Sequence, residues 1–199
     1  DNPRVMHFHD RDGLNKKPAG NALAQEFSSG PVYRDDILYQ VLLSAILDAR
    51  QELVITTPYF VPDEGLVQAL MAAAHRGVKV KLIVPRLNDS TLVAWSSRSF
   101  YSALLGAGVE IAEFKGGLLH TKSLLIDERT AIFGSVNFDQ RSLRLNFEIS
   151  LIVYDQVFCT QLKELTTSYL KRSQIINRIG WERRPRWRRL LENTAHLAS

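Results

Sequence analysis

The sequence has little that could form disulfide bonds or cross a membrane. Cys159 is the single cysteine among 199 residues, which excludes an intrachain disulfide. No apolar run reaches the ~18–20 residues that a membrane-spanning helix needs. No signal peptide is visible and the sequence starts at Asp1 rather than at methionine, so we expect a processed or truncated product. What remains is an ordinary globular composition, 45% hydrophobic and 23% charged, which suits one α/β domain.

Net positive charge is absent outside the C-terminal end of the chain. The net charge is +4, yet residues 171–189 contain one acid, Glu182, against eight basic residues: Lys171, Arg172, Arg178, Arg183, Arg184, Arg186, Arg188 and Arg189. Trp181 and Trp187 lie among these arginines, and both residue types favour the headgroup layer of an anionic membrane. Residues 177–199 are therefore predicted to be a basic tail at a membrane interface. A solvated end, a packed helix end and nucleic-acid binding are the alternatives.

Turn-forming residues dominate the N-terminal end, and regular apolar periodicity follows. Residues 1–30 are rich in Asn, Asp, Gly and Pro and are predicted to be a linker or extended segment. Residues 31–176 are predicted to be one α/β catalytic domain. The expected helices are a first one capped by Asp35 or Asp36, then 63–75, about 89 to 106 or 108, and 156–176. The expected strands are 53–57, 78–84, 109–114, 118–126, 131–136 and 147–153, with a tight turn at Glu128-Arg129.

The most informative segment of the chain is HTKSLLIDERTAIFGSVN. It contains the pattern H-x-K-x4-D and then G-S-x-N, formed by His120, Lys122, Asp127, Gly134, Ser135 and Asn137. Residues two apart on a strand point to the same face, so His120 and Lys122 are expected together, and so are Ser135 and Asn137. A hairpin between them brings both pairs to one end of a sheet. Asp127 falls at the turn, where we expect it to anchor the hairpin rather than touch a substrate.

These residue types can hold and attack a phosphate without a metal or a cofactor. The imidazole of His120 titrates near neutral pH, so it can act as a nucleophile or as a general acid. The ammonium of Lys122 can neutralise phosphate oxygens, and Ser135 and Asn137 can donate further hydrogen bonds. Glu148 lies on the next strand between apolar residues and could orient an imidazole. A lone histidine on a strand is usually structural, but the full set at this spacing predicts a site.

The pattern resembles the HKD motif of the phospholipase D superfamily, which has the form H-x-K-x4-D followed by G-S-x-N. The resemblance covers about residues 30–190 and points to the C-terminal half of bacterial cardiolipin synthases. It rests on the segments TTPYFVPDEGLVQAL, RGVKVKLIVPRLNDSTLVAWSSRSFY, GGLLHTKSLLID and NFDQRSLRLNFEISL. It implies a phospholipase D-like α/β fold, with a mixed β-sheet flanked by helices on both faces.

The same resemblance implies a mechanism. Enzymes of this family join two HKD motifs at one site: one histidine becomes phosphohistidine, and the other protonates the leaving alcohol and activates the incoming one. In cardiolipin synthases a phosphatidyl group moves from one phosphatidylglycerol to the glycerol hydroxyl of another, and glycerol is released. By position, His120 has the acid/base role, Lys122 and Asn137 hold phosphate oxygens, and Glu148 pairs with the histidine of the opposite motif. The implied location is the bacterial inner membrane, bound peripherally.

The chain departs from that pattern because it contains one HKD motif instead of two. We expect either that an N-terminal half with the first motif is missing or that two copies pair as a homodimer, and truncation is favoured. Two other classes stay open: a homodimeric phosphodiesterase or nuclease, and a catalytically inert membrane-binding module. The expected partners are phosphatidylglycerol, a membrane surface and the second motif; nucleic acid is not expected.

Overall fold

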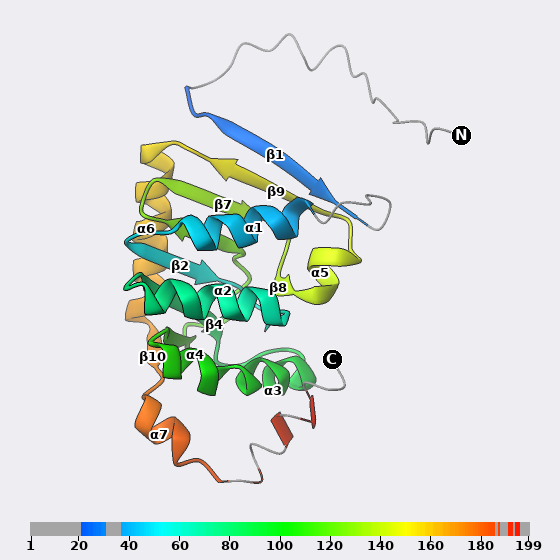
Figure 1. Ribbon diagram of the computed structural model, residues 1–199, viewed down its shortest axis with the longest axis vertical. Coiled ribbons are helices and arrows are strands. Elements are labelled where there is room, and N and C mark those ends of the chain that lie inside the picture. Colours follow the sequence, from blue (N-terminus) through cyan, green and yellow to red (C-terminus); the bar gives the residue numbers. More distant parts are fainter. Residues whose placement is uncertain (1–20, 31–36, 186, 188–190, 193, 196–199) are drawn as a thin grey trace, which may run out of the picture.

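A mixed β-sheet forms the centre of the molecule (Figure 1). The computed structural model describes residues 21–30, 37–185, 187, 191–192 and 194–195. Within them, the main sheet has the spatial order β1 (Ala24–Ser29), β9 (Glu148–Val153), β7 (Thr130–Gly134), β6 (Ser123–Ile126), β2 (Glu52–Thr56), β4 (Lys79–Pro85), β5 (Glu110–Phe114) and β10 (Ser173–Ile175). Neighbours among β2, β4 and β5 pair in parallel, and the other neighbouring strands are antiparallel.

Helices cover both faces of this sheet, as the sequence predicts. Three helices share one large apolar cluster with the sheet: α1 (Ile37–Asp48), α2 (Glu64–His75) and α4 (Tyr101–Ala107). On the other face, α6 (Gln156–Lys171) buries Cys159 and Leu162 in a smaller cluster. The shorter elements are α3 (Thr91–Ser99), α5 (Gln140–Arg144), α7 (Arg178–Glu182) and a parallel pair of strands, β3 (Phe60–Val61) and β8 (Phe138–Asp139).

Local sequence accounts for several element boundaries. The carboxylate of Asp63 accepts a hydrogen bond from the backbone N–H three residues later, which caps the start of α2. The hydroxyl of Ser90 caps α3 in the same way. The second half of β4, Leu82 to Val84, is a continuous apolar run because both of its faces are buried: Leu82 points into the larger cluster and Ile83 into the smaller one.

The sequence does not predict that the residues immediately before residue 30 belong to the sheet. Residues 24–29, which fall in the predicted linker or extended segment, form the edge strand β1, which pairs antiparallel with β9 from Ala24↔Val153 to Ser29↔Glu148. The sequence AQEFSS gives no apolar alternation, because most of this strand is exposed and only Phe27 packs against the core. Main-chain pairing with β9, rather than side-chain burial, therefore determines this strand.

Two long helices predicted from the sequence are wrong in their extent. The helix expected at 156–176 ends at Lys171, and β10 follows and pairs antiparallel with β5. The helix expected from about residue 89 is divided at Phe100 into α3 and α4. The ring of Phe100 lies edge-on to Phe60, with ring centroids 6.1 Å apart, so a tertiary contact accompanies this break.

The turn between β6 and β7 lies one residue earlier than the predicted Glu128-Arg129 pair. Asp127 and Glu128 have positive φ angles of 50° and 56°, as a two-residue type I′ turn requires. The hydrogen bond from Arg129 N–H to the Ile126 carbonyl closes it at 2.9 Å. At 2.7–3.3 Å, the Asp127 carboxylate accepts hydrogen bonds from the backbone N–H groups of Arg50, Gln51 and Glu52. Asp127 therefore fastens the hairpin to the start of β2.

The described part of the basic tail packs against the domain. The ring of Trp181 in α7 packs against Tyr101 of α4 at a tilt of 37°, with ring centroids 5.0 Å apart. Arg184 forms an ion pair with Glu192 at 2.6 Å, and both side chains are almost fully buried. A packed end therefore describes this part of the tail, whereas membrane contact stays a prediction. None of the helices in the described ranges is long and apolar enough to cross a bilayer.

Parts of three predictions lie outside the described residues. They are the linker before residue 21, the helix cap at Asp35 or Asp36, and the tail arginines Arg186, Arg188 and Arg189.

Replacement of Asp127 tests its role as the anchor of the hairpin. Asp127→Asn keeps one acceptor oxygen and a side chain that tolerates positive φ, whereas Asp127→Ala loses both. We expect the free energy of unfolding to fall by about 1 kcal/mol for Asn and about 2–3 kcal/mol for Ala. Urea unfolding at pH 7, followed by circular dichroism, measures both losses. Equal losses in the two variants would contradict the anchor.

The stabilisation from Asp127 should also depend on pH. Burial acts to raise the pKa of this carboxyl, but the three backbone N–H groups outweigh it and hold the pKa below its ordinary value. A lowered pKa stabilises the folded state above the unfolded value, and this stabilisation is lost as pH falls through the folded value. The stability difference between wild type and Asp127→Asn should therefore be constant above about pH 5 and shrink as pH falls through the lowered pKa of Asp127.

Candidate active site

His120 and Lys122 lie at the edge of the sheet where the parallel strands end. The predicted strand 118–126 begins only at Ser123, so both residues precede it in irregular chain. Ser123 pairs with Thr56, the last residue of β2, so the two motif residues lie beside the carboxyl end of β2. In open α/β sheets this edge is the usual place for ligands.

Lys122 is half-buried, whereas His120 is exposed. The Lys122 ammonium donates a hydrogen bond to the backbone carbonyl of His120 at 3.1 Å, which holds the amine beside the histidine. Burial lowers the pKa of Lys122 below its ordinary value, and the charge of Glu148 counteracts part of that shift. The amine therefore faces a carboxylate from the start of β9.

Ser135 and Glu148 form a direct contact across β7 and β9. The predicted strand 131–136 ends at Gly134, so Ser135 lies just beyond it. Its hydroxyl donates to a Glu148 carboxylate oxygen and accepts from the Ile149 N–H at 3.0 Å. The other Glu148 oxygen accepts from the Asn146 side chain at 3.2 Å. Lys122, Ser135 and Glu148 thus form one cluster.

Asn137 is connected to the N-terminus of α5 rather than to this cluster. Its side-chain amide donates to the Ser142 hydroxyl at 3.2 Å, and Ser142 in turn donates to Asp139 at 3.1 Å. Asp139 caps α5 by accepting from the Ser142 N–H at 2.7 Å. The buried side-chain oxygen Oδ1 of Asn137 has no hydrogen-bond partner among the described residues. Asp139 and Ser142 escape a search for chemical motifs because a helix cap is their only local signal.

Asp127 lies at the opposite end of β6 from His120. It follows the last residue of β6, and its carboxylate binds the backbone at the start of β2. With a rise of roughly 3.3 Å per residue, a four-residue strand separates the two sites by more than about 10 Å. The D of the H-x-K-x4-D pattern is therefore placed to support the hairpin and not to touch a group bound at His120.

Gly134 allows β7 and β9 to approach closely. A Cβ atom at this position would collide with the Ile149 carbonyl and lie 2.7 Å from the Ser150 Cα atom. Both obstacles are backbone atoms, so neither can rotate away. The approach brings Ser135 within hydrogen-bonding range of Glu148 on the facing strand.

The arrangement can bind an anion and exchange protons. An exposed imidazole, a half-buried ammonium and a serine hydroxyl lie at the edge of the sheet, beside a carboxylate that limits the local positive charge. Across the described part of the chain, no three His, Cys, Asp or Glu side chains are grouped closely enough to hold a metal ion.

The fold and this site define a phospholipase D-like domain. The family described as "Cardiolipin synthase, PLD-like domain" matches residues 42–170. The chain belongs to this family.

Curated relatives extend the match over most of the chain. Cardiolipin synthase A of Serratia proteamaculans is 49% identical over 175 residues, which cover 88% of this chain and 36% of that protein. Cardiolipin synthase A of Buchnera aphidicola is 45% identical over 189 residues, which cover 95% of this chain and 39% of that protein. The chain therefore spans little more than a third of the length of these relatives.

Solved structures agree with the fold. Nuc from Salmonella typhimurium, a phospholipase D family member, has a TM-score of 0.67 at 18% identity, and the match covers 79% of this chain and 99% of Nuc. Phosphatidylserine synthase from Haemophilus influenzae has a TM-score of 0.68 at 20% identity, covering 88% of this chain and 46% of that chain.

Substitution of Gly134 tests the close approach of β7 and β9. Gly134→Ala should lower the free energy of unfolding by about 1–3 kcal/mol, because the added methyl group forces two backbones apart. Gly106→Ala is the matched control: this glycine lies on the exposed side of α4, where a Cβ atom meets nothing within 4 Å. The control should be neutral or slightly stabilising. Chemical unfolding of the two variants gives the comparison, and equal stabilities would refute the packing constraint.

Proposed function

We propose that this chain is one catalytic half of a phosphatidyltransferase that makes cardiolipin from two phosphatidylglycerol molecules. The observation that carries the proposal is the 45–49% identity to cardiolipin synthase A over most of the chain. Because the chain spans little more than a third of those relatives, the remainder of the site comes from another polypeptide segment. That segment is an N-terminal half or a second copy of this chain.

The proposed reaction uses two imidazoles in two steps. The partner imidazole attacks the phosphorus of one phosphatidylglycerol, and the bond from phosphorus to the glycerol oxygen breaks as His120 donates a proton to that oxygen. This step leaves a phosphohistidine and releases glycerol. His120 then removes the proton from a glycerol hydroxyl of the second lipid, whose oxygen attacks phosphorus while the P–N bond breaks. The exposure of His120 suits both proton transfers.

The remaining site residues bind and orient in this proposal. Lys122 holds the non-bridging phosphate oxygens, where an ammonium stabilises the charge that develops during displacement. The side-chain amide of Asn137 has two N–H donors; one binds Ser142, and the other is assigned to the same phosphate oxygens. The half-burial of Lys122 strengthens that interaction, because fewer waters compete for the amine. Glu148 orients the partner imidazole, and its hydrogen bonds from Ser135 and Asn146 fix the carboxylate for that role.

An apolar surface beside the site fits the proposed partner. Leu145, Phe147 and Ile149 surround Glu148 in the sequence and are 64%, 71% and 50% exposed. Exposed apolar residues grouped at one place mark a contact surface more often than scattered ones do. A chain of this size covers 99% of Nuc but only 36% of a cardiolipin synthase A, so pairing of two copies and pairing with an N-terminal half are both geometrically reasonable. In either assembly the chain acts peripherally at the inner membrane.

Loss of His120 should abolish transfer in the assembled enzyme. The assembly is either a pair of copies or this chain joined to the preceding part of the Serratia proteamaculans relative. We expect His120→Ala to reduce the conversion of labelled phosphatidylglycerol to cardiolipin by roughly 10²–10⁴-fold, the usual contribution of a general acid–base group. His75→Ala is the matched control, since His75 is exposed at the end of α2 and far from the motif in sequence.

Other outcomes of this assay identify the competing functions. Cleavage of DNA without cardiolipin formation would favour a phosphodiesterase or nuclease. Vesicle binding that survives His120→Ala, with no turnover in any assembly, would favour an inert membrane-binding module. Full activity from a particle whose sedimentation mass equals one chain would refute the need for a second motif.

A further inference from the structure

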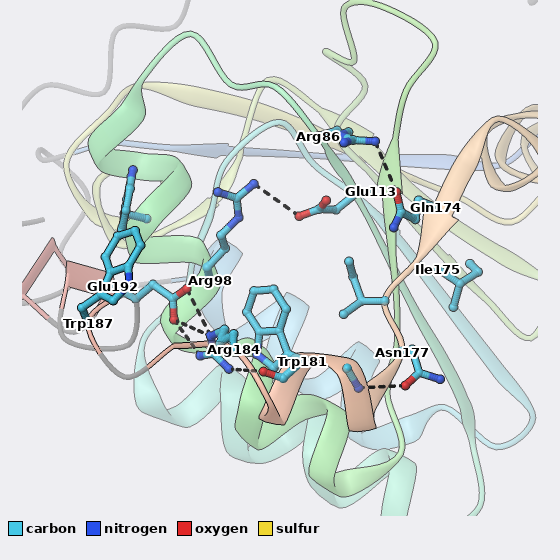
Figure 2. Close-up of a pocket in the computed structure, with 13 residues that line it drawn as sticks. Arg86, Arg98, Glu113, Gln174, Ile175, Asn177, Trp181, Arg184, Trp187 and Glu192 are labelled. Atoms are coloured by element: carbon cyan, nitrogen blue, oxygen red, sulfur yellow. Dashed lines mark hydrogen bonds and ion pairs between the residues drawn. The ribbon is translucent and has the colours of Figure 1, made fainter.

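A cavity of about 610 Å³ lies at the β5–β10 end of the sheet, between α3, β5, β10 and the described part of the tail (Figure 2). Arg86 directly follows β4, and Glu113 is the penultimate residue of β5, so the cavity opens near the carboxyl edge. In the order β6-β2-β4-β5, three strand spacings separate β6 from β5, which is roughly 14 Å. The cavity is therefore distinct from the cluster of Lys122, Ser135 and Glu148, and its volume is typical of small-molecule sites.

Two arginines give the cavity its positive charge. Arg86 is exposed, and its guanidinium donates to the neutral side chain of Gln174 at 3.2 Å. Arg98 of α3 points toward Glu113 at 3.5 Å, the outer limit of a hydrogen bond, and is about one-third exposed. Glu113 is 8% exposed, so two guanidinium groups face one buried carboxylate. Guanidinium groups with spare donors are suited to phosphate oxygens.

The described part of the tail forms a wall of this cavity, and its two charged lining residues, Arg184 and Glu192, neutralise each other. Arg184 is paired with Glu192 at 2.6 Å and also donates to the Trp181 carbonyl at 2.9 Å. Its guanidinium stacks on the Trp181 ring, 4.1 Å from the centroid. The donors of Arg184 are thus used within the protein, which leaves Arg86 and Arg98 as the cations available to a ligand among the described residues of the lining.

Neutral and acidic groups beside the arginines can form hydrogen bonds with the hydroxyl groups of a ligand. The Glu113 carboxylate and the Gln174 amide can accept hydrogen bonds from them. The buried indole N–H of Trp181 has no hydrogen-bond partner within the part of the chain that the structure describes, so it is a further donor in the wall. A purely apolar ligand would leave these groups unsatisfied, and a metal cation would be repelled by the two arginines.

We propose that this cavity binds a phosphorylated polyol, with the phosphate between Arg86 and Arg98 and the hydroxyl groups on Glu113 and Gln174. The headgroup of phosphatidylglycerol and free glycerol phosphate both have this chemistry. The proposal goes beyond the transfer reaction at His120 and does not depend on it, because the two sites use different residues.

Tryptophan fluorescence gives a direct measurement of binding. All three tryptophans of the chain, Trp95, Trp181 and Trp187, line the cavity. We expect sn-glycerol 3-phosphate to produce a saturable change in emission, inorganic phosphate a weaker one at the same concentration, and glycerol none. If neither sn-glycerol 3-phosphate nor phosphatidylglycerol vesicles produce a saturable change in emission, the proposal is overturned, whatever the result of the transferase assay.

Charge variants locate the phosphate. Arg86→Gln should weaken binding of sn-glycerol 3-phosphate by roughly tenfold or more, the effect of losing a hydrogen bond to a charged group. Lys79→Gln removes one positive charge at the opposite end of the same strand and is the matched control. Arg86 is exposed, so circular dichroism should report an intact fold for both variants. Equal affinity in Arg86→Gln and Lys79→Gln would overturn the proposed phosphate position.

Glu113→Gln separates phosphate binding from polyol binding. Removal of the carboxylate should leave inorganic phosphate bound as tightly or more tightly, while the preference for sn-glycerol 3-phosphate over phosphate falls at least several-fold. Unchanged preference would overturn the role of Glu113.

Vesicles of phosphatidylglycerol, compared with vesicles of phosphatidylcholine, then distinguish the source of the ligand. An emission change with phosphatidylglycerol vesicles but not with sn-glycerol 3-phosphate assigns the cavity to the lipid headgroup, and the reverse assigns it to the free ester.

Discussion

The antiparallel pairing of β2 with β6 is the constraint on which the rest of the structure depends. It joins the parallel strands β2, β4 and β5 to the antiparallel strands β6, β7 and β9, and it aligns Ser123 with Thr56 at the carboxyl edge. At the opposite end of these strands, the carboxylate of Asp127 accepts hydrogen bonds from three backbone N–H groups at the start of β2, which fixes the register of β6 against β2. A shift of one residue would turn every β6 side chain to the other face. The position of His120 and Lys122 therefore follows from a bond network at the far end of the same strand.

Close backbone packing then determines which polar groups meet. The absence of a side chain at Gly134 lets β7 lie against β9, and this contact brings the Ser135 hydroxyl to Glu148. Glu148 in turn lowers the cost of half-burying Lys122, since it favours the charged amine that burial disfavours. His120 has a different environment, because it is exposed at the edge of the cluster. That contrast fits a site in which the cation is fixed before substrate binds and the imidazole exchanges protons with a partner.

The sequence predicts those parts of the fold that depend on side-chain burial. The buried runs of β2, β4 and β5, and the helical spacing of α2, are visible because they exclude water on one or both faces. The strands β1 and β10 are not visible, because they lie at the two edges of the sheet and are determined by main-chain pairing. In the candidate site, the spacing of His120 and Lys122 is readable from the sequence. Their position in irregular chain ahead of β6 is not. The sequence also predicts Asp127 at the turn, away from them, but the two positive φ angles of that turn depend on the pairing around it.

The C-terminal arginines illustrate why a count of charges is a weak guide to function. Arg184 belongs to the basic run in the sequence, yet in the structure Glu192 neutralises it and Trp181 stacks on it. Arg86 and Arg98 belong to no basic run, yet both line one cavity, where the buried carboxylate of Glu113 balances only one of their two positive charges. The electrostatic field at a ligand depends on which charges are already paired and how far they are desolvated, and neither property is encoded in composition. If the proposed cavity binds a phosphorylated polyol, its affinity comes from two arginines separated by 12 positions in the sequence and brought together by the carboxyl ends of β4 and α3.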